Sequence, residues 1–260
     1  MFQYDFMQHA LWAIILASLI AGLVGYITLL RRLAFAAHGL GHISFTGATL
    51  ALLLHTSPLL GQFAATLVAA YLMGLLGEDL QKRDQVIAMV LSFMLGLGML
   101  FLHEETQSAN AAVSLLFGNV LGVSPIEIKW MAAVSLVILI VFALILRPLL
   151  LSSMMPGWAA ARGVPTRGLG IVLMLILALA VTLVAQIVGA LLVFTLLIGP
   201  AAISMQWTQH FWTGLIFSVL SALILSILAL ILAFYNNWPV SVWLTILVFA
   251  GYVLSVGIRR

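Results

Sequence analysis

Long runs of apolar residues, separated by short polar segments, recur along the whole chain. An α-helix needs about 20 mostly apolar residues to cross the hydrocarbon core of a bilayer. Nine segments reach or approach that length, and they cover residues 10–30, 33–54, 59–77, 86–102, 128–146, 169–188, 190–205, 211–234 and 240–257. This pattern predicts an all-α polytopic membrane protein with eight to nine transmembrane helices in one bundle.

The count of eight or nine depends on the segment 190–205, which is separated from the preceding segment only by Gly189. We therefore expect a short or broken helix there. A further amphipathic stretch, 109–121, is a candidate for a partial element in the membrane interface. No Gly/Ser-rich linker divides the chain, so a single transmembrane domain over residues 1–260 is expected.

Composition excludes the soluble classes of protein. About 65% of the residues are hydrophobic and 7% are charged, whereas soluble domains carry about 25% charged residues. The chain has no Cys, which excludes disulfides and thiolate metal sites. It also lacks the GxxxxGK[ST] phosphate loop, so it is not expected to hydrolyse ATP. The surplus of three positive charges is interpreted as loop topology and not as nucleic-acid binding.

Basic residues gather on one side when the segments are threaded alternately across a bilayer. Cytoplasmic loops of membrane proteins carry an excess of Lys and Arg. With Arg31 and Arg32 placed inside, every other Lys and Arg except Lys129 also falls inside. The acidic pair Glu104 and Glu105 then falls outside. We therefore expect an external N-terminus and a cytoplasmic C-terminus.

Two histidines interrupt the second apolar segment. His38 and His42 are four residues apart, which places both imidazoles on one face of a helix. At 1.5 Å per residue they lie roughly 8 and 14 Å from the start of the span. Imidazoles at that depth face a protein interior or a water-filled path more often than lipid.

The spacing of His38 and His42 allows both to bind one metal ion. A protonated imidazole cannot bind a cation, so transport through such a site is expected to weaken below about pH 6.5. The alternative is that both histidines are structural and form hydrogen bonds with neighbouring helices.

Other ionisable residues lie at the expected external ends of helices. His55, His103, Glu104 and Glu105 are candidates for a cation entrance, and ordinary interfacial solvation is the alternative explanation. On the opposite side, in the segment 155–165, Pro156 suits the first turn of a short helix and Gly163 suits its end. Such a helix in a cytoplasmic loop is a natural docking surface, and a simple surface loop is the alternative.

Three segments together resemble the permease subunits of the zinc/manganese-type ABC importer family. The family pattern Phe-x-Gly-Asp-Ala-x-Ser-His-x-x-x-x-Gly is matched at Phe35, His42 and Gly47. Residues 156–164 are similar to the family pattern Pro-Glu-x-Ala-x-x-x-Gly-Val. Residues 188–202 closely resemble Gly-x-Leu-Leu-x-x-x-Leu-Leu-x-x-Pro-Ala-Ala, which is the most specific of the three. The resemblance covers almost the whole chain.

The chain departs from the family pattern at informative positions. His38 stands where the family has Asp, Ala37 and Gly41 replace its Gly and Ser, and Gly157 replaces the Glu of the cytoplasmic loop. Carboxylate ligands suit Mn²⁺, whereas two imidazoles suit Zn²⁺ and other late divalent ions. The substitution at position 38 therefore favours zinc, with manganese as the alternative.

The resemblance implies a permease that moves a divalent metal ion into the cytoplasm by alternating access. It implies a homodimer of permeases in the bacterial inner membrane, with cytoplasmic ABC ATPase subunits and an extracytoplasmic metal-binding protein as partners. The chain itself would not be an enzyme and would hold no permanent cofactor. The metal path would contain His38 and His42. The ATPase-coupling loop would comprise Pro156, Gly157, Trp158, Ala159, Ala160, Ala161, Arg162, Gly163 and Val164.

Two rival functions belong to other classes of membrane protein. A secondary, ion-coupled metal transporter would need buried carboxylates as proton relays, and the confident spans contain no Asp or Glu. A bis-histidine haem subunit would need histidines on opposite faces of the haem, which His38 and His42 on one helix face do not provide. The absorbance spectrum of the haem would distinguish such a subunit from an ABC permease and from a secondary transporter.

Overall fold

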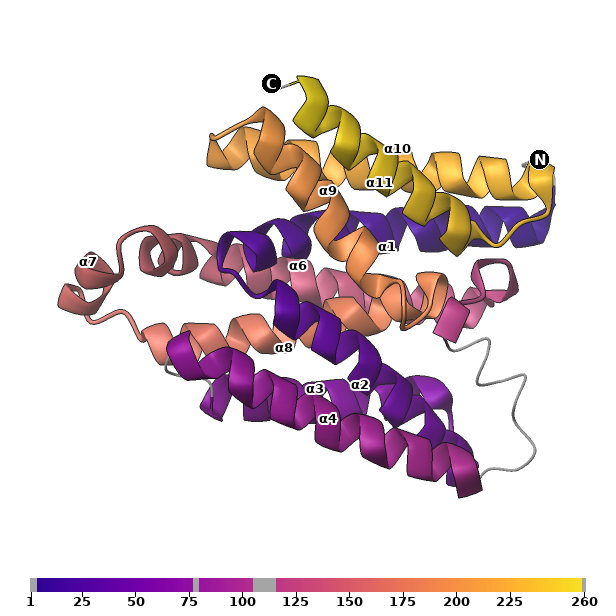
Figure 1. The fold of residues 1–260 in the computed structure, drawn as a ribbon, viewed down its shortest axis with the longest axis horizontal. Helices are drawn as coiled ribbons and strands as arrows, with labels where there is room; N and C mark the ends of the chain where they lie inside the picture. Colours follow the sequence, from indigo (N-terminus) through magenta and orange to yellow (C-terminus); the bar gives the residue numbers. More distant parts are fainter. Residues whose placement is uncertain (1–3, 77–79, 105–115, 259–260) are drawn as a thin grey trace.

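The structure is a computed structural model that describes residues 4–76, 80–104 and 116–258. Within these ranges the chain is almost entirely helical and contains no strand (Figure 1). The elements are α1 Asp5–Leu30, α2 Ala34–Leu53, α3 Pro58–Leu76, α4 Leu80–Glu104, the 3₁₀ turn η1 Val120–Gly122, α6 Pro125–Met154, α7 Pro156–Ala161, α8 Thr166–Val188, α9 Val193–Trp207, α10 Phe211–Asn236 and α11 Val240–Ile258.

The all-α membrane fold expected from the sequence is confirmed. Among the described helices, seven are long and apolar enough to cross a bilayer, namely α1, α3, α4, α6, α8, α10 and α11. Helix α2 has 20 residues, so it also has the required length, and its two histidines lower its hydropathy. Helix α9 has only 15 residues, as expected for the segment after Gly189.

Several helices extend beyond the apolar segments that predicted them, and α1 and α6 are two examples. Helix α1 begins at Asp5 instead of residue 10, and α6 continues through Arg147 and Pro148 to Met154. The span expected to end at residue 146 therefore belongs to a helix that continues to Met154. Hydropathy marks where the hydrocarbon core ends, but a helix continues into the headgroup region, where its charged side chains are solvated. Of the amphipathic stretch 109–121, residues 109–115 lie outside the described ranges, and the remainder contains η1.

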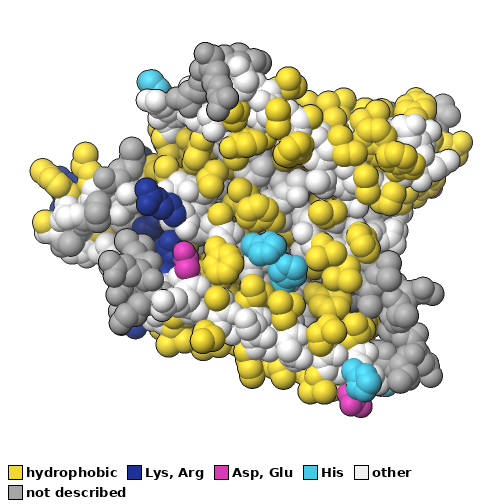
Figure 2. Space-filling view, in the orientation of Figure 1, with side chains coloured by type: hydrophobic (Ala, Val, Ile, Leu, Met, Phe, Trp, Pro, Cys, Tyr) yellow, Lys and Arg dark blue, Asp and Glu magenta, His cyan; other side chains and the backbone are white. Residues whose placement is uncertain are grey.

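The helices form a layered bundle in which α1 and α8 are the most buried spans (Figure 1). Helices α2, α3 and α4 pack together on one side of this centre, and α9, α10 and α11 pack together on the other. Helix α7 lies at one end of the molecule, and the N-terminus lies at the opposite end. Figure 2 shows Lys and Arg side chains gathered toward the α7 end of the face in view.

Helix α2 is held in place by close contacts with two neighbours. It crosses α3 where Gly47 and Gly61 meet, and small residues at such a crossing let the backbones approach closely. On the α4 side, the hydroxyl of Thr46 donates a hydrogen bond to the carbonyl oxygen of Met94 at 2.9 Å. These contacts fix the rotation of α2, and with it the direction in which the side chains on its remaining face point.

A turn with an unusual backbone joins α8 to α9. Gly189 ends α8 with φ +89°, and Gly118 of the segment before η1 has φ +77°. The backbones of these two glycines touch, and a side chain at either position would overlap the other segment. The amide of Leu191 also donates a hydrogen bond to the carbonyl oxygen of Leu116 at 3.3 Å.

Candidate functional site

The two histidines of α2 form a contacting pair. Their Nε2 atoms are 3.3 Å apart, and their ring planes are nearly perpendicular at 87°. Because His38 and His42 are one helical turn apart, both rings project from the same face of α2. When both imidazoles are neutral, one Nε2–H donates a hydrogen bond to the other Nε2, and the tautomers decide which ring is the donor.

The pair lies on an open apolar face of the molecule. Both histidines are half-buried, and the ring of Phe194 from α9 packs edge-on against His38 with centroids 5.6 Å apart. Figure 2 shows histidine side chains together near the middle of this face, with hydrophobic side chains around them. Imidazoles within a membrane rarely face lipid, so this part of α2 is expected to face protein or water.

The geometry of the pair suits a metal ion. Two nitrogens bound to one tetrahedral Zn²⁺ at about 2.0–2.1 Å are about 3.3–3.4 Å apart, and the observed separation of the two Nε2 atoms is 3.3 Å. Across the described part of the chain, His, Asp and Glu side chains form no group of three or more that could hold a metal ion. One copy therefore offers two nitrogen ligands and leaves the rest of a coordination shell open.

The candidate entrance residues do not join this pair. His55 is exposed beyond the end of α2, thirteen residues after His42, which corresponds to about 20 Å along a helix. His103 and Glu104 are exposed at the end of α4. Glu105 lies outside the described residues. His55, His103 and Glu104 lie at the end of the molecule away from α7. An entrance role for the four residues stays a prediction.

The segment expected to be a short helix in a loop is helical. Helix α7 spans Pro156–Ala161, and Gly163 follows it with φ +69°, as a helix-ending glycine does. Trp158 is 64% exposed and carries the guanidinium of Arg162 over its ring at 5.7 Å from the centroid. Ala159 is fully buried, so the helix presents one face outward and packs the other against the bundle.

The sequence matches a family of transport proteins along nearly its whole length. Residues 3–259 match the family described as the ABC 3 transport family. The chain belongs to the ABC 3 transport family. Among its relatives is an uncharacterized membrane protein of Synechocystis, which is 32% identical and aligns over 99% of this chain and 92% of that protein.

A second relative in the ABC 3 transport family carries a functional name. The manganese transport system membrane protein MntC of Halalkalibacterium halodurans is 30% identical over 80% of this chain and 71% of that protein. A solved structure, titled PsaBC from Streptococcus pneumoniae in complex with Fab, shares the fold with a TM-score of 0.86 and 25% identity. That match covers 97% of this chain and 91% of the other. The permease-type fold is therefore shown.

Sequence reasoning missed two features of this ABC 3 family member. Phe194 lies against His38 although 156 positions separate them, and nothing in the local pattern around either residue signals this contact. Arg31 and Arg83 were used only as markers of topology, yet they line one cavity. The sequence did offer one signal for this cavity, because several basic residues lie at helix ends on the same side of the membrane.

Proposed function

We propose that this chain is the membrane-spanning permease subunit of an ABC importer that moves a divalent transition-metal ion into the cytoplasm. Membership of the ABC 3 transport family supports the transport role. The name of the manganese transport relative supports a metal ion as cargo, and the fold shared with the PsaBC structure supports the arrangement of the membrane helices. ATP hydrolysis would take place in separate cytoplasmic subunits, so the chain itself performs no covalent chemistry.

The observation that carries the proposal is the contact between His38 and His42. The two Nε2 atoms are separated by the distance that a shared metal ion requires, and they lie within a membrane-length helix. One copy supplies only two of the four ligands of a closed site. A site whose ligands come from separate chains suits a path, because the ion has to leave again toward the cytoplasm.

A second copy of the chain would complete the coordination shell. The histidine pair lies on an apolar face, and neighbouring exposed aromatic side chains such as Phe35 and Phe194 offer a surface that another copy would cover. Twofold symmetry would then bring four imidazoles, two from each copy, around one ion on the axis. Closed oligomers of identical chains most often have this symmetry.

The identity of the metal follows from the ligand set. Four imidazoles suit Zn²⁺ and other late divalent ions better than Mn²⁺, which prefers carboxylate and water oxygens. The named relative is a manganese transport protein, so His38, in place of the family's Asp, marks where this chain departs from a manganese-type path. We therefore propose zinc as the preferred cargo and manganese as the second.

Helix α7 is the proposed contact with the ATPase subunits. It lies at the end of the molecule toward which Lys and Arg side chains gather, and its outer face is exposed. Cytoplasmic loops carry the excess of basic residues, so this end is assigned to the cytoplasm and the N-terminus to the exterior. An extracytoplasmic binding protein would deliver the ion to the opposite end, where His55, His103 and Glu104 lie.

Metal uptake tests the proposal directly. Cells that lack their own zinc and manganese importers would express the chain with its partner subunits, and the uptake of radioactive zinc and manganese would be measured. His42→Ala and His42→Gln are expected to reduce uptake at least tenfold while leaving membrane insertion and subunit assembly intact. His210→Ala is the matched control, because His210 is exposed at the start of α10. Wild-type uptake by both His42 variants would show that the histidines are structural.

The energy source separates this function from a secondary transporter. The acidic residues that the structure describes, Asp5, Asp84, Glu104 and Glu127, all lie within five residues of an end of their helices. None is placed to relay protons through the middle of the membrane. Uptake should therefore stop when the ATPase subunit is inactivated and continue when the proton gradient is dissipated with ATP held constant. The opposite result would favour a proton-coupled carrier, and a Soret absorbance band would favour a haem subunit.

A further inference from the structure

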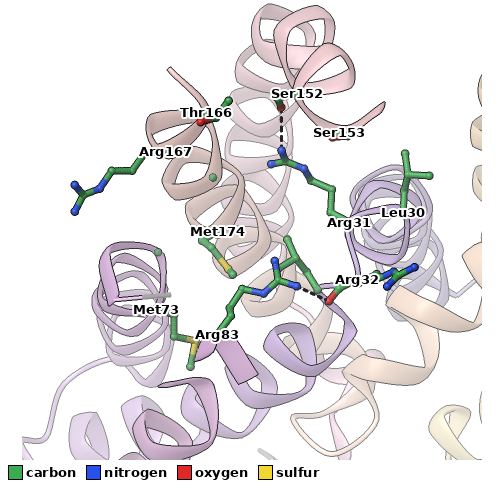
Figure 3. Close-up of a pocket in the computed structure, with 13 residues that line it drawn as sticks. Leu30, Arg31, Arg32, Met73, Arg83, Ser152, Ser153, Thr166, Arg167 and Met174 are labelled. Atoms are coloured by element: carbon green, nitrogen blue, oxygen red, sulfur yellow. Dashed lines mark hydrogen bonds between the residues drawn. The ribbon is translucent and has the colours of Figure 1, made fainter. Parts of the chain in front are cut away.

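A cavity of about 600 Å³ opens at the α7 end of the bundle, away from the histidine pair. It lies where the junction of α1 and α2 meets the beginnings of α4 and α8 and the end of α6 (Figure 3). No Asp or Glu is among the lining residues that the structure describes. Those lining residues are Leu30, Arg31, Arg32, Leu33, Met73, Gly74, Arg83, Ser152, Ser153, Thr166, Arg167, Gly170 and Met174.

Two guanidinium groups approach this cavity from opposite sides. In Figure 3, the side chain of Arg31 extends from the end of α1 and that of Arg83 from the beginning of α4. Arg31 donates a hydrogen bond to the hydroxyl of Ser152 at 2.9 Å, and Arg83 donates one to the carbonyl oxygen of Arg32 at 3.0 Å. Each guanidinium has five N–H donors, so these two bonds leave donors available to a ligand.

The cavity is lined by positive charge that is partly shielded from water. Arg31 is half-buried, and burial, followed by the nearby charge of Arg83, lowers the pKa of its guanidinium below the ordinary value. The Nε atom of Arg83 is buried and has no hydrogen-bond partner among the described residues. Unpaired buried charge is costly, and an anion between the two guanidiniums would remove most of that cost.

The start of α8 adds a third contribution to the same cavity. The residue before the helix is Pro165, which provides no side-chain hydrogen bond to the first turn. The first backbone N–H groups of a helix are donors that favour a negative charge. Thr166 and Gly170 of this first part of α8 line the cavity, so the guanidinium groups and the N-terminal end of a helix border the same space. This combination is typical of a phosphate site.

We infer that this cavity binds a phosphate group, carried by an anionic phospholipid of the leaflet on the α7 side. Apolar side chains share the lining with the arginines, including Leu30 at the end of α1 and the buried Met73 and Met174. A lipid offers a charged headgroup and an apolar glycerol–acyl region to these two kinds of wall, whereas a free phosphate ion uses only the first. Basic pockets between transmembrane helices on the cytoplasmic side are suited to such headgroups.

Bound phosphate would connect two parts of the molecule. Arg31 and Arg83 belong to the elements around the start of α2, whereas Ser152 lies at the end of α6, next to α7. An anion shared by the two arginines would hold these parts together, because Arg31 also donates a hydrogen bond to Ser152. The binding inference itself rests on the cavity and its charges, and it stands apart from the proposed metal transport.

Thermal unfolding of the purified full-length protein tests the inference. The protein would be held in a neutral detergent and titrated with phosphatidylglycerol, phosphatidylcholine or inorganic phosphate. Phosphatidylglycerol at saturating concentration is expected to raise the unfolding midpoint by about 5 °C, and phosphatidylcholine is expected to have little effect. Arg31→Gln and Arg83→Gln should each weaken the apparent affinity for phosphatidylglycerol about tenfold or more.

Arg147→Gln is the matched control, because Arg147 is exposed on α6 outside the cavity and loses the same charge. Its response should remain that of the wild type. Each variant is first compared without lipid, and Arg83→Lys, which keeps the charge, provides a second measurement if Arg83→Gln does not fold. Native mass spectrometry counts the phosphatidylglycerol molecules that remain bound to wild type and to each variant.

The other outcomes overturn the lipid assignment. A shift with inorganic phosphate that depends on Arg31 and Arg83, and equals the phosphatidylglycerol shift, would identify a site for the free ion. An equal loss of response in Arg147→Gln would show that phosphatidylglycerol acts through general surface charge. If lipid has no effect but Arg83→Gln releases the ATPase subunit during purification, the cavity receives an acidic side chain of a partner protein.

Discussion

Gly47 of α2 and Gly61 of α3 face each other so closely that a Cβ atom on either residue would overlap the carbonyl oxygen of the other. The contact involves backbone atoms on both sides, so no side-chain rotation can relieve an added methyl group. The two helices would have to separate, and the packing of α2 in the bundle would change with them.

Gly47→Ala is therefore expected to destabilise the protein by about 1–3 kcal/mol or more, which corresponds to a fall of roughly 5 °C in the unfolding midpoint in detergent. Gly96→Ala is the control, since Gly96 lies within α4 and a Cβ there would meet open space. That variant should be neutral or slightly stabilised, because Ala favours a helix more than Gly does. Equal midpoints for both variants would contradict the tight crossing.

The cargo preference is expected to change at position 38. His38→Asp replaces a nitrogen ligand by a carboxylate, which suits Mn²⁺ better than Zn²⁺. Transport should be retained, and the ratio of manganese to zinc uptake should rise by about tenfold or more, measured with both isotopes in one assay. His38→Asn is the control, since it has a similar shape without the charge. An unchanged ratio in the Asp variant would place the selectivity elsewhere.

A second copy of the chain is expected to cover the face around the histidine pair. The native chain has no Cys, so single cysteines report on contacts without background. Phe35→Cys and Phe194→Cys should form dimers under mild oxidation in membranes. Leu144→Cys is the control, since Leu144 is 74% exposed on α6, a helix that makes no substantial contact with α2. Dimers from Leu144→Cys alone would move the interface to α6.

Contact with an ATPase subunit is expected along the outer face of α7. Cysteines at Gly157 and Trp158 should crosslink to cysteines on the ATPase, and Ala160→Cys belongs to the same scan. Ala159→Cys should not crosslink, because Ala159 is fully buried. If no position from 156 to 164 crosslinks, the docking site lies elsewhere on the chain.

Membrane orientation is checked with reporter fusions. A reporter fused after Arg260 should be active in the cytoplasm, and one inserted after Glu105 should be external, following the excess of basic residues on the α7 side. Reporters on the same side would show that the number of crossings between the two positions is even instead of odd.

Hydrophobicity along the chain was enough to predict the membrane helices and most of their limits. The segment 240–257 corresponds to α11, Val240–Ile258, because the partition of side chains between water and hydrocarbon depends only on local composition. The continuation of α6 past Arg147 was not predicted, because a hydropathy pattern ends at the first charge while backbone hydrogen bonding does not.

The histidine pair was predicted as one face because a four-residue spacing fixes that relationship within any helix. The contact of Phe194 with His38, and the approach of Arg83 to Arg31, were beyond prediction. Both depend on how separate helices pack. Helix packing depends on contacts between residues far apart in the sequence, such as Gly47 with Gly61. The periodicity within one helix does not contain this information.

The close backbone contact of Gly118 with Gly189 couples residues 116–119, before η1, to the turn that leads into α9. The backbone of each glycine fills the space that a side chain of the other would occupy. Residues 116–119 therefore cannot move toward the turn without moving the turn as well. Phe194 lies five residues beyond Gly189, and its ring rests on His38. A movement of residues 116–119 is therefore expected to shift residues 189–194, and with them the ring that contacts His38.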